Sequence, residues 1–223
     1  MQFFVRTFVV LFGLAFVVVG FLVGVGMAGE ARSAAARAEA LLPLTAAQLD
    51  DQLPGQPALV EGQLSPRNPV RFRDFVAYVR EEFRGTDSNG DEQWFEDERV
   101  TPPLLVEAAG LIRISNDSYA LDAPHARWQE EGLEWSSRTQ EGTRRYRGLV
   151  AGRPVLALGT VTRGAEGNEL QAELVYGGTR AEYIAAQRSV ARWLPWLGLC
   201  MGAAGLAVII LGLWVLRTWR PKR

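Results

Sequence analysis

The spacing that comes closest to a chemical site lies in an acidic stretch, Asp87-Ser88-Asn89-Gly90-Asp91-Glu92. Oxygen ligands at positions 1, 3, 5 and 12 are typical of a calcium-binding loop. That register is occupied by Asp87, Asn89, Asp91 and Glu98. Against calcium, position 6 is Glu92 instead of glycine, and the flanking segments are typical of strand and coil, not of paired helices. We favour an exposed acidic connection between strands, in which Asn-Gly forms a tight turn.

The chain has a single histidine, His125. General-base catalysis would need a nucleophile or an orienting carboxylate beside it in space. Asp122 is near in sequence, but no serine-containing elbow accompanies it, so we expect a surface-loop histidine. Phosphate-binding glycine loops, HExxH and GxSxG are also absent. We therefore predict no catalytic or cofactor-binding residue and no enzyme.

A short basic run, Arg144-Arg145-Tyr146-Arg147, falls in a predicted strand. Strand alternation puts Arg145 and Arg147 on one face and Arg144 with Tyr146 on the other. This is a usual pattern for a solvated strand. The alternative is contact with anionic lipid headgroups, although three arginines are fewer than the four to eight typical of lipid-binding clusters.

Composition excludes several classes of partner and site. The net charge is −1, from 24 basic and 25 acidic residues. A nucleic-acid partner needs a basic excess, so none is expected. The one cysteine, Cys200, lies inside an apolar run and cannot form an intrachain disulfide or a cysteine zinc site. We interpret it as a small apolar side chain.

Two uncharged apolar runs, 7–28 and 193–214, stand at opposite ends of the chain. Each is as long as the roughly 20 helical residues that cross a bilayer, so we predict two transmembrane helices. For the first run a cleaved signal peptide is the alternative, but its apolar core would span only about 7–15 residues. The second run is flanked by Trp193, Trp196, Trp214 and Trp219, as in interfacial aromatic belts.

The short tails 1–6 and 215–223 decide the predicted orientation. Arginines also occur on the loop side, among them Arg32 and Arg192, so a raw count of basic residues does not settle it. Long loops cross membranes largely regardless of charge, which leaves the basic tails as the better indicator. We predict a two-pass membrane protein with both termini in the cytoplasm and the central domain outside it.

Each apolar run contains two glycines four residues apart. The pairs are Gly20 with Gly24 and Gly198 with Gly202. Such pairs let another helix backbone approach closely, which suggests that the two helices pair or drive oligomers. The alternative is that glycine is simply frequent in membrane helices.

The segment between the runs divides into a stalk and a domain. The alanine-rich residues 29–42 favour helix, and prolines and glycines after them open a domain at 43–192. Seven or eight short strands are predicted there, including a hairpin that joins 111–115 to 119–121. The predicted fold class is therefore two transmembrane α-helices flanking a mainly-β domain, a small barrel or sandwich with some helix.

Short motifs follow the first apolar run in a definite order. They are Leu59-Val60-Glu61-Gly62, Val76-Ala77-Tyr78, Pro102-Pro103-Leu104-Leu105-Val106, Ala109-Gly110-Leu111-Ile112-Arg113-Ile114, Gly152-Arg153-Pro154-Val155-Leu156-Ala157-Leu158-Gly159-Thr160-Val161 and Val175-Tyr176-Gly177-Gly178, with Tyr183-Ile184 before the closing run. In this order they resemble the GIDE-type domain of the mitochondrial-anchored GIDE family of E3 ubiquitin ligases and of many small bacterial proteins. The resemblance implies a β-rich domain beside the membrane that binds or senses something.

The sequence departs from those ligases after the second apolar run. In the ligases a RING finger follows and recruits the ubiquitin-charged enzyme, whereas here no cysteine follows Cys200. Ubiquitin transfer is therefore not expected. We expect a non-catalytic, membrane-anchored interaction or sensor module with a protein partner or a second copy of itself. The alternative is a structural subunit of a larger membrane complex, held through its glycine-faced helices.

Overall fold

The computed structural model describes residues 2–218, and the side chains of residues 7–214. The predicted basic tails therefore lie outside the described side chains. The chain forms two compact units. One is a β domain, Ala40–Tyr183, and the other is a helical unit formed by residues before 40 and after 183. The β domain was predicted to span 43–192, whereas in the structure a helix begins at Arg180 and continues without interruption to Thr218.

The helical unit consists of two long stretches of helix. The first comprises α1 (Gln2–Phe21), a π-helical segment η1 (Leu22–Met27) and α2 (Ala28–Ala40), and the second is α4 (Arg180–Thr218). Both are long and apolar enough to cross a membrane. Large apolar side chains on them are exposed, for example Phe8 and Trp193, each 68% exposed. The predicted spans 7–28 and 193–214 lie within these stretches, and α2 covers most of the predicted stalk.

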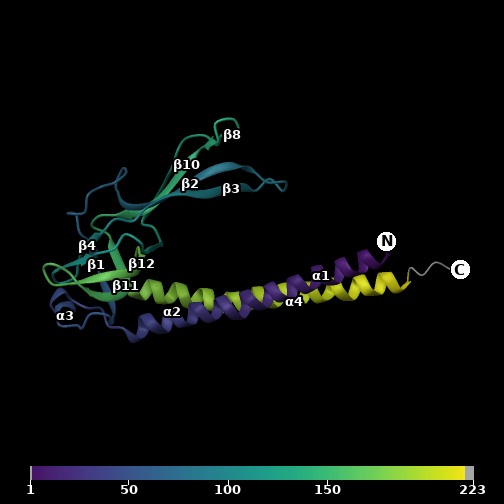
Figure 1. Ribbon diagram of the computed structural model, residues 1–223, viewed down its shortest axis with the longest axis horizontal. Helices are drawn as coiled ribbons and strands as arrows, with labels where there is room; N and C mark the ends of the chain where they lie inside the picture. Colours follow the sequence, from purple (N-terminus) through teal and green to yellow (C-terminus); the bar gives the residue numbers. More distant parts are fainter. Residues whose placement is uncertain (1, 219–223) are drawn as a thin grey trace. The chain divides into compact units, whose positions relative to one another are not determined.

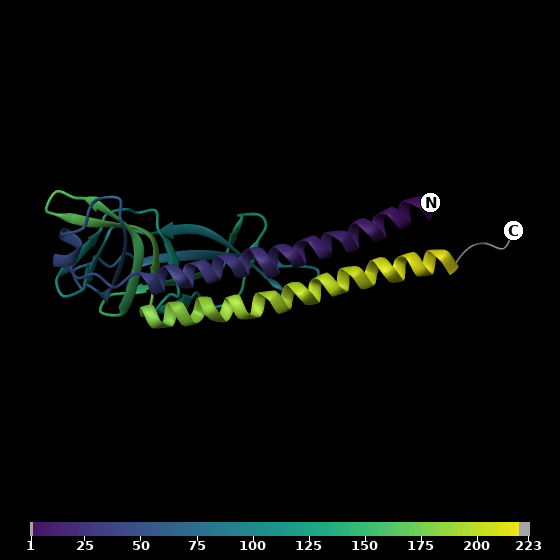
Figure 2. The ribbon, with the colours of Figure 1, turned by 90° about the horizontal axis from the view of Figure 1, so that it is seen from below.

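The two helical stretches run side by side in opposite directions (Figure 2). Their backbones approach closely at Gly20, Gly24 and Gly198, and again where Gly13 meets Gly205. A Cβ atom added at Gly198 would lie 2.6 Å from the Gly24 Cα atom. Gly202 differs, because a Cβ atom there would meet nothing within 4 Å. The predicted packing glycines thus lie together within one chain. Gly202 contacts Gly20 through its backbone, but a side chain at position 202 would not disturb the contact.

The β domain is built on a closed five-stranded barrel (Figure 1). Its strands pair in the cyclic order β11-β1-β4-β5-β12 and back to β11, and all these pairs are antiparallel except β5 with β12. The strands are β1 (Pro57–Leu64), β4 (Leu104–Glu107), β5 (Leu111–Ile114), β11 (Pro154–Arg163) and β12 (Asn168–Tyr176). Because β11 returns beside β1, the connection is a Greek key. Five-stranded Greek-key barrels such as the OB-fold host many unrelated functions, so the barrel itself assigns none.

Asn116 helps to close the barrel where β5 meets β12. The ladder there has only one register pair, Leu170 with Ile114. The Asn116 side chain continues it, since its amide donates to the Ala172 carbonyl at 2.8 Å and its carbonyl accepts from the Ala172 N–H at 2.8 Å. The chain therefore runs on along β12, where β6 (Ala120–Asp122) pairs in parallel. The predicted hairpin between 111–115 and 119–121 is wrong for this reason.

The barrel is filled by aliphatic side chains and covered at one end by α3 (Ala46–Asp50). Leu49 of this short helix is 1% exposed. Asn168 holds the helix to β12, because its side-chain amide donates to the carbonyls of Leu49, Asp50 and Gln52. The prediction of a mainly-β domain is confirmed, and of the two architectures left open the structure contains the barrel.

A second, antiparallel sheet extends from the barrel within the β domain (Figure 1). Its strand order is β3-β2-β10-β7. The bounds are β2 (Phe75–Thr86), β3 (Glu92–Val100), β7 (Ala126–Gln129) and β10 (Arg144–Val150), and a small pair, β8 (Trp135–Ser136) and β9 (Glu141–Gly142), lies beyond β7 in the chain. Strands β3 and β7 were not predicted. The base of β2 is buried in the barrel core through Val76 and Ala77, which joins the two sheets.

The glycine contact gives a matched pair of variants. Gly198→Leu should separate the two helices, because a side chain there collides with the α1 backbone, whereas Gly202→Leu should leave them paired. The readout is a disulfide between cysteines placed at Val9 and Gly212, in a Cys200→Ser background. A Cβ atom at Gly212 would lie 3.3 Å from the Val9 Cβ atom, near the span of a disulfide. Equal cross-linking in both variants would contradict the glycine contact.

Candidate functional site

The four residues that matched a calcium loop are not brought together by the structure. Asp87 lies in the turn between β2 and β3, and its Oδ1 accepts from the N–H groups of Asn89 at 2.8 Å and Asp91 at 3.0 Å. Glu98 lies well along β3, where it pairs with Arg80 at 2.6 Å and accepts from the Tyr78 hydroxyl. No cluster of three or more metal-ligating side chains occurs among the described residues. The stretch is a hairpin turn, with Gly90 at a φ of +86°.

His125 has a structural role beside the barrel. Its Nδ1 accepts from the Val150 N–H at 3.0 Å, so the proton of the neutral ring is on Nε2, which donates to the Pro154 carbonyl at 2.8 Å. The ring therefore joins the end of β10 to the start of β11. Burial lowers its pKa, in spite of the bond to Pro154, and Arg153 lowers it further. The expected surface-loop histidine is instead a half-buried bridge between strands.

One face of the second sheet carries a row of arginines. Arg127 of β7 lies directly opposite Arg147 of β10. Arg145, two residues back along β10, lies opposite Gln129 on one side and Glu81 of β2 on the other. Directly opposed residues share a face, and alternate residues return to it. We call this surface, formed by Arg127, Gln129, Arg145, Arg147 and Glu81, the arginine face.

The charges of the arginine face are unequal. Glu81 is the carboxylate among these five residues and pairs with two arginines, Arg145 at 2.6 Å and Arg147 at 3.5 Å. Glu96, directly opposite Glu81 on β3, pairs with Arg99 at 2.8 Å. Arg145 is further held over the Trp94 ring, 4.2 Å from its centroid. Arg127 makes no ion pair with any described residue. The Arg147 Nε atom is buried and has no hydrogen-bond partner in the part of the chain that the structure describes.

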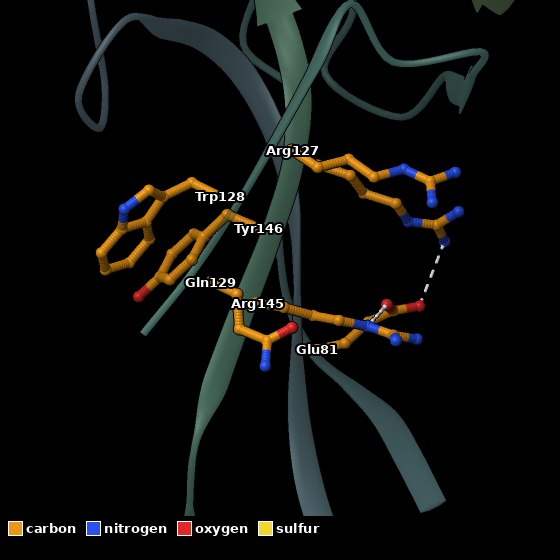
Figure 3. A pocket seen from close by; sticks show the side chains of 7 residues that line it. Glu81, Arg127, Trp128, Gln129, Arg145 and Tyr146 are labelled. Carbon is orange, nitrogen blue, oxygen red and sulfur yellow. Dashed lines mark hydrogen bonds and ion pairs between the residues drawn. The ribbon is translucent and has the colours of Figure 1, made fainter. Parts of the chain in front are cut away.

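The residues of the arginine face, together with Trp128 and Tyr146, line a cavity of about 310 Å³. Figure 3 shows the guanidinium groups of Arg127 and Arg145 and the Glu81 carboxylate on one side of the strands, with Trp128 and Tyr146 on the other. Two opposed arginines with spare donors form a cradle for an anion, because a guanidinium group can donate two parallel hydrogen bonds to a phosphate, sulfate or carboxylate.

The opposite face of the same strands is aromatic and fixes their position. Phe72 stacks on Tyr146 with ring centroids 4.1 Å apart, and Tyr146 also contacts Tyr78 and Trp128. The Arg73 guanidinium lies over the Trp128 ring, 3.8 Å from its centroid. Since aromatic contacts of this kind hold β7 against β10, they keep the arginines of the other face in place.

The division of the basic run between two faces was predicted, and the register confirms it. Arg145 and Arg147 share one face, whereas Tyr146 packs into the aromatic cluster on the other. Arg127 was not predicted as a site residue. The signal available was the polar–aromatic–polar alternation Arg127-Trp128-Gln129, which is too short to distinguish an edge strand from a loop.

The bridge formed by His125 should make the β domain sensitive to acid. Because the pKa of His125 is lower in the folded protein, the histidine of the unfolded chain takes up a proton at a higher pH as the solution is acidified. The free energy of unfolding should therefore fall as pH drops below about 6.5. His125→Asn, which keeps an acceptor near Val150, should have a flatter profile between pH 7.5 and 5.5, above the usual range of carboxylates. Urea unfolding of the full-length protein in detergent, followed by circular dichroism, measures this. Equal acid sensitivity in both proteins would contradict the bridge.

The chain was also compared with proteins of known family and structure. The resemblance to the GIDE-type domain stays a prediction, because none of these comparisons bears on it. Its short motifs lie mostly in barrel strands. The arginine face lies outside the barrel, in the second sheet. The comparisons find no matching protein family, no matching curated protein and no matching solved structure.

Proposed function

We propose that this protein is a non-catalytic, membrane-anchored binding module whose β domain recognises an anionic group on the arginine face. The observation that carries the proposal is the Arg127–Arg147 pair, two arginines directly opposite each other. Arg147 shares the Glu81 carboxylate with Arg145, and Arg127 has no carboxylate partner among the described residues. Like charges placed opposite each other in a sheet are destabilising. An anion held between them would remove that repulsion.

Membrane insertion is supported by the alignment of the two apolar runs. The glycine contacts place Val9 beside Gly212 and Gly24 beside Pro195 and Gly198. The runs 7–28 and 193–214 therefore cover the same length of the helical unit, as two helices crossing one hydrocarbon layer must. With both ends of the chain on the same side, the basic tails favour a cytoplasmic location for both termini and an extracytoplasmic β domain.

The chemistry of the arginine face favours binding over catalysis. Its polar groups are guanidinium groups, an amide and one carboxylate, and the carboxylate is held in ion pairs. These groups can orient an anion, and Arg127 and Arg147 carry the donors that are not committed to Glu81. The partner would then present a phosphate, sulfate or carboxylate outside the membrane, for example on an acidic protein segment.

The alternative function, a structural subunit held through its glycine-faced helices, has less support. The glycines that would contact another subunit, Gly20, Gly24 and Gly198, meet one another within the chain. A partner helix would have to use a different face of the helical unit.

The test uses full-length protein in detergent, titrated with inorganic phosphate, sulfate and a glutamate-rich peptide. Arg127→Gln with Arg147→Gln should weaken binding of the preferred anion by about tenfold or more, since each hydrogen bond to a charged group contributes roughly 1.5–3 kcal/mol. The control, Arg84→Gln with Arg113→Gln, removes the same charge from outside the arginine face and should leave the affinity unchanged.

Stability measurements separate a binding role from a structural one. Without ligand, Arg127→Gln should leave the free energy of unfolding unchanged or raise it by up to about 1 kcal/mol, because a repulsive pair is removed. If this variant instead destabilises the domain, or if both double variants lose equal affinity, the arginine face is not the binding site.

A further inference from the structure

A second basic cavity lies in the helical unit, between α2 and α4. It has a volume of about 340 Å³ and is lined by three arginines, one glutamate and three alanines. The arginines are Arg32 from α2 and Arg188 and Arg192 from α4. Alanines such as Ala36 leave the space between them open, because no bulky side chain fills it.

The cavity has more positive than negative charge. Its one carboxylate, Glu39, pairs with Arg188 at 2.8 Å. Neither Arg32 nor Arg192 forms an ion pair with a described residue. Glu30 is the other carboxylate of α2, and it does not line the cavity. Two arginines from different helices thus face one space without a counter-ion.

The position of the cavity identifies the kind of anion that would reach it. Arg192 directly precedes Trp193, the first residue of the second apolar run, and Arg32 lies four residues beyond Ala28, the last residue of the first. At 1.5 Å per residue, Arg32 stands about 6 Å outside the hydrocarbon layer, which is the depth of the headgroup region. Trp193 and Trp196 are 68% and 62% exposed, as side chains at a membrane interface would be.

We infer that this cavity binds the phosphate of an anionic phospholipid headgroup, with Arg32 and Arg192 as its principal ligands. The inference rests on the membrane insertion proposed above, and it does not depend on the arginine face. It differs from general attraction to a charged surface, because the anion is held between two helices and a basic pocket of this kind selects headgroups. The lipid would also join α2 to α4 at the point where they leave the membrane.

The experiment is native mass spectrometry of the full-length protein, released from nanodiscs with equal phosphatidylglycerol and phosphatidylcholine. Wild type should retain phosphatidylglycerol. Arg32→Gln with Arg192→Gln should reduce that retention by about 25-fold, taking about fivefold for each arginine near a membrane surface. The control Arg84→Gln with Arg113→Gln removes the same charge from the β domain and should retain the lipid.

A further variant tests the cavity and not its charge. Ala36→Leu keeps every arginine but fills the space, so it should lose phosphatidylglycerol selectively. Retention by Ala36→Leu at the wild-type level would mean that surface charge alone attracts the lipid, and the inference would fall. Equal retention of both lipids by wild type would overturn it as well.

Alkaline carbonate extraction of the same proteins distinguishes the two failures. Protein released by carbonate would show that the helices do not insert, and the proposed anchoring would fall with the headgroup site. Protein that stays in the membrane but shows no preference for phosphatidylglycerol would overturn the headgroup site alone.

Discussion

The close approach of two helix backbones at Gly20, Gly24 and Gly198 fixes the arrangement of the helical unit. Without side chains at these points the helices touch backbone to backbone, and such a contact allows one relative height and little sliding. This height sets the apolar runs level with each other. It also brings Arg32 and Arg192 to the same cavity, so the contact that aligns the hydrophobic surfaces also positions the arginines of the basic cavity.

The β domain divides its tasks between two sheets. The barrel supplies the core, and its weakest join, between β5 and β12, is completed by a side-chain amide where the backbone ladder ends. The second sheet buries little on its arginine face and much on its aromatic face. Charge repulsion on one face is thus tolerated because ring packing on the other holds the strands. Binding sites often carry such local destabilisation, which the rest of the fold offsets.

Helices and strands could be predicted from the sequence where one face of the element, or all of it, is apolar. The apolar runs and the strands Pro57–Leu64 and Pro154–Arg163 follow directly from hydrophobic patterns. Strand β3 (Glu92–Val100) was missed because it is acidic and largely exposed, so no alternation marks it. The four residues of the calcium spacing are not brought together, because a motif is defined along the chain, whereas the extended strand β3 carries Glu98 away from Asp87. Arg127 faces Arg147 only through a register set by distant turns, which local patterns do not contain.

The π-helical segment η1 has a consequence for how this chain can change over evolutionary time. A π turn contains one residue more than an α turn, so the helix beyond it is rotated by about 100° relative to a regular continuation. The buried alanines of α2, Ala28, Ala31, Ala35 and Ala38, keep their inward orientation only with that extra residue in place. The number of residues in Leu22–Met27 must therefore be kept more strictly than their types. Deletion of one residue there would turn Arg32 away from α4, although the apolar run would still be long enough to cross a membrane.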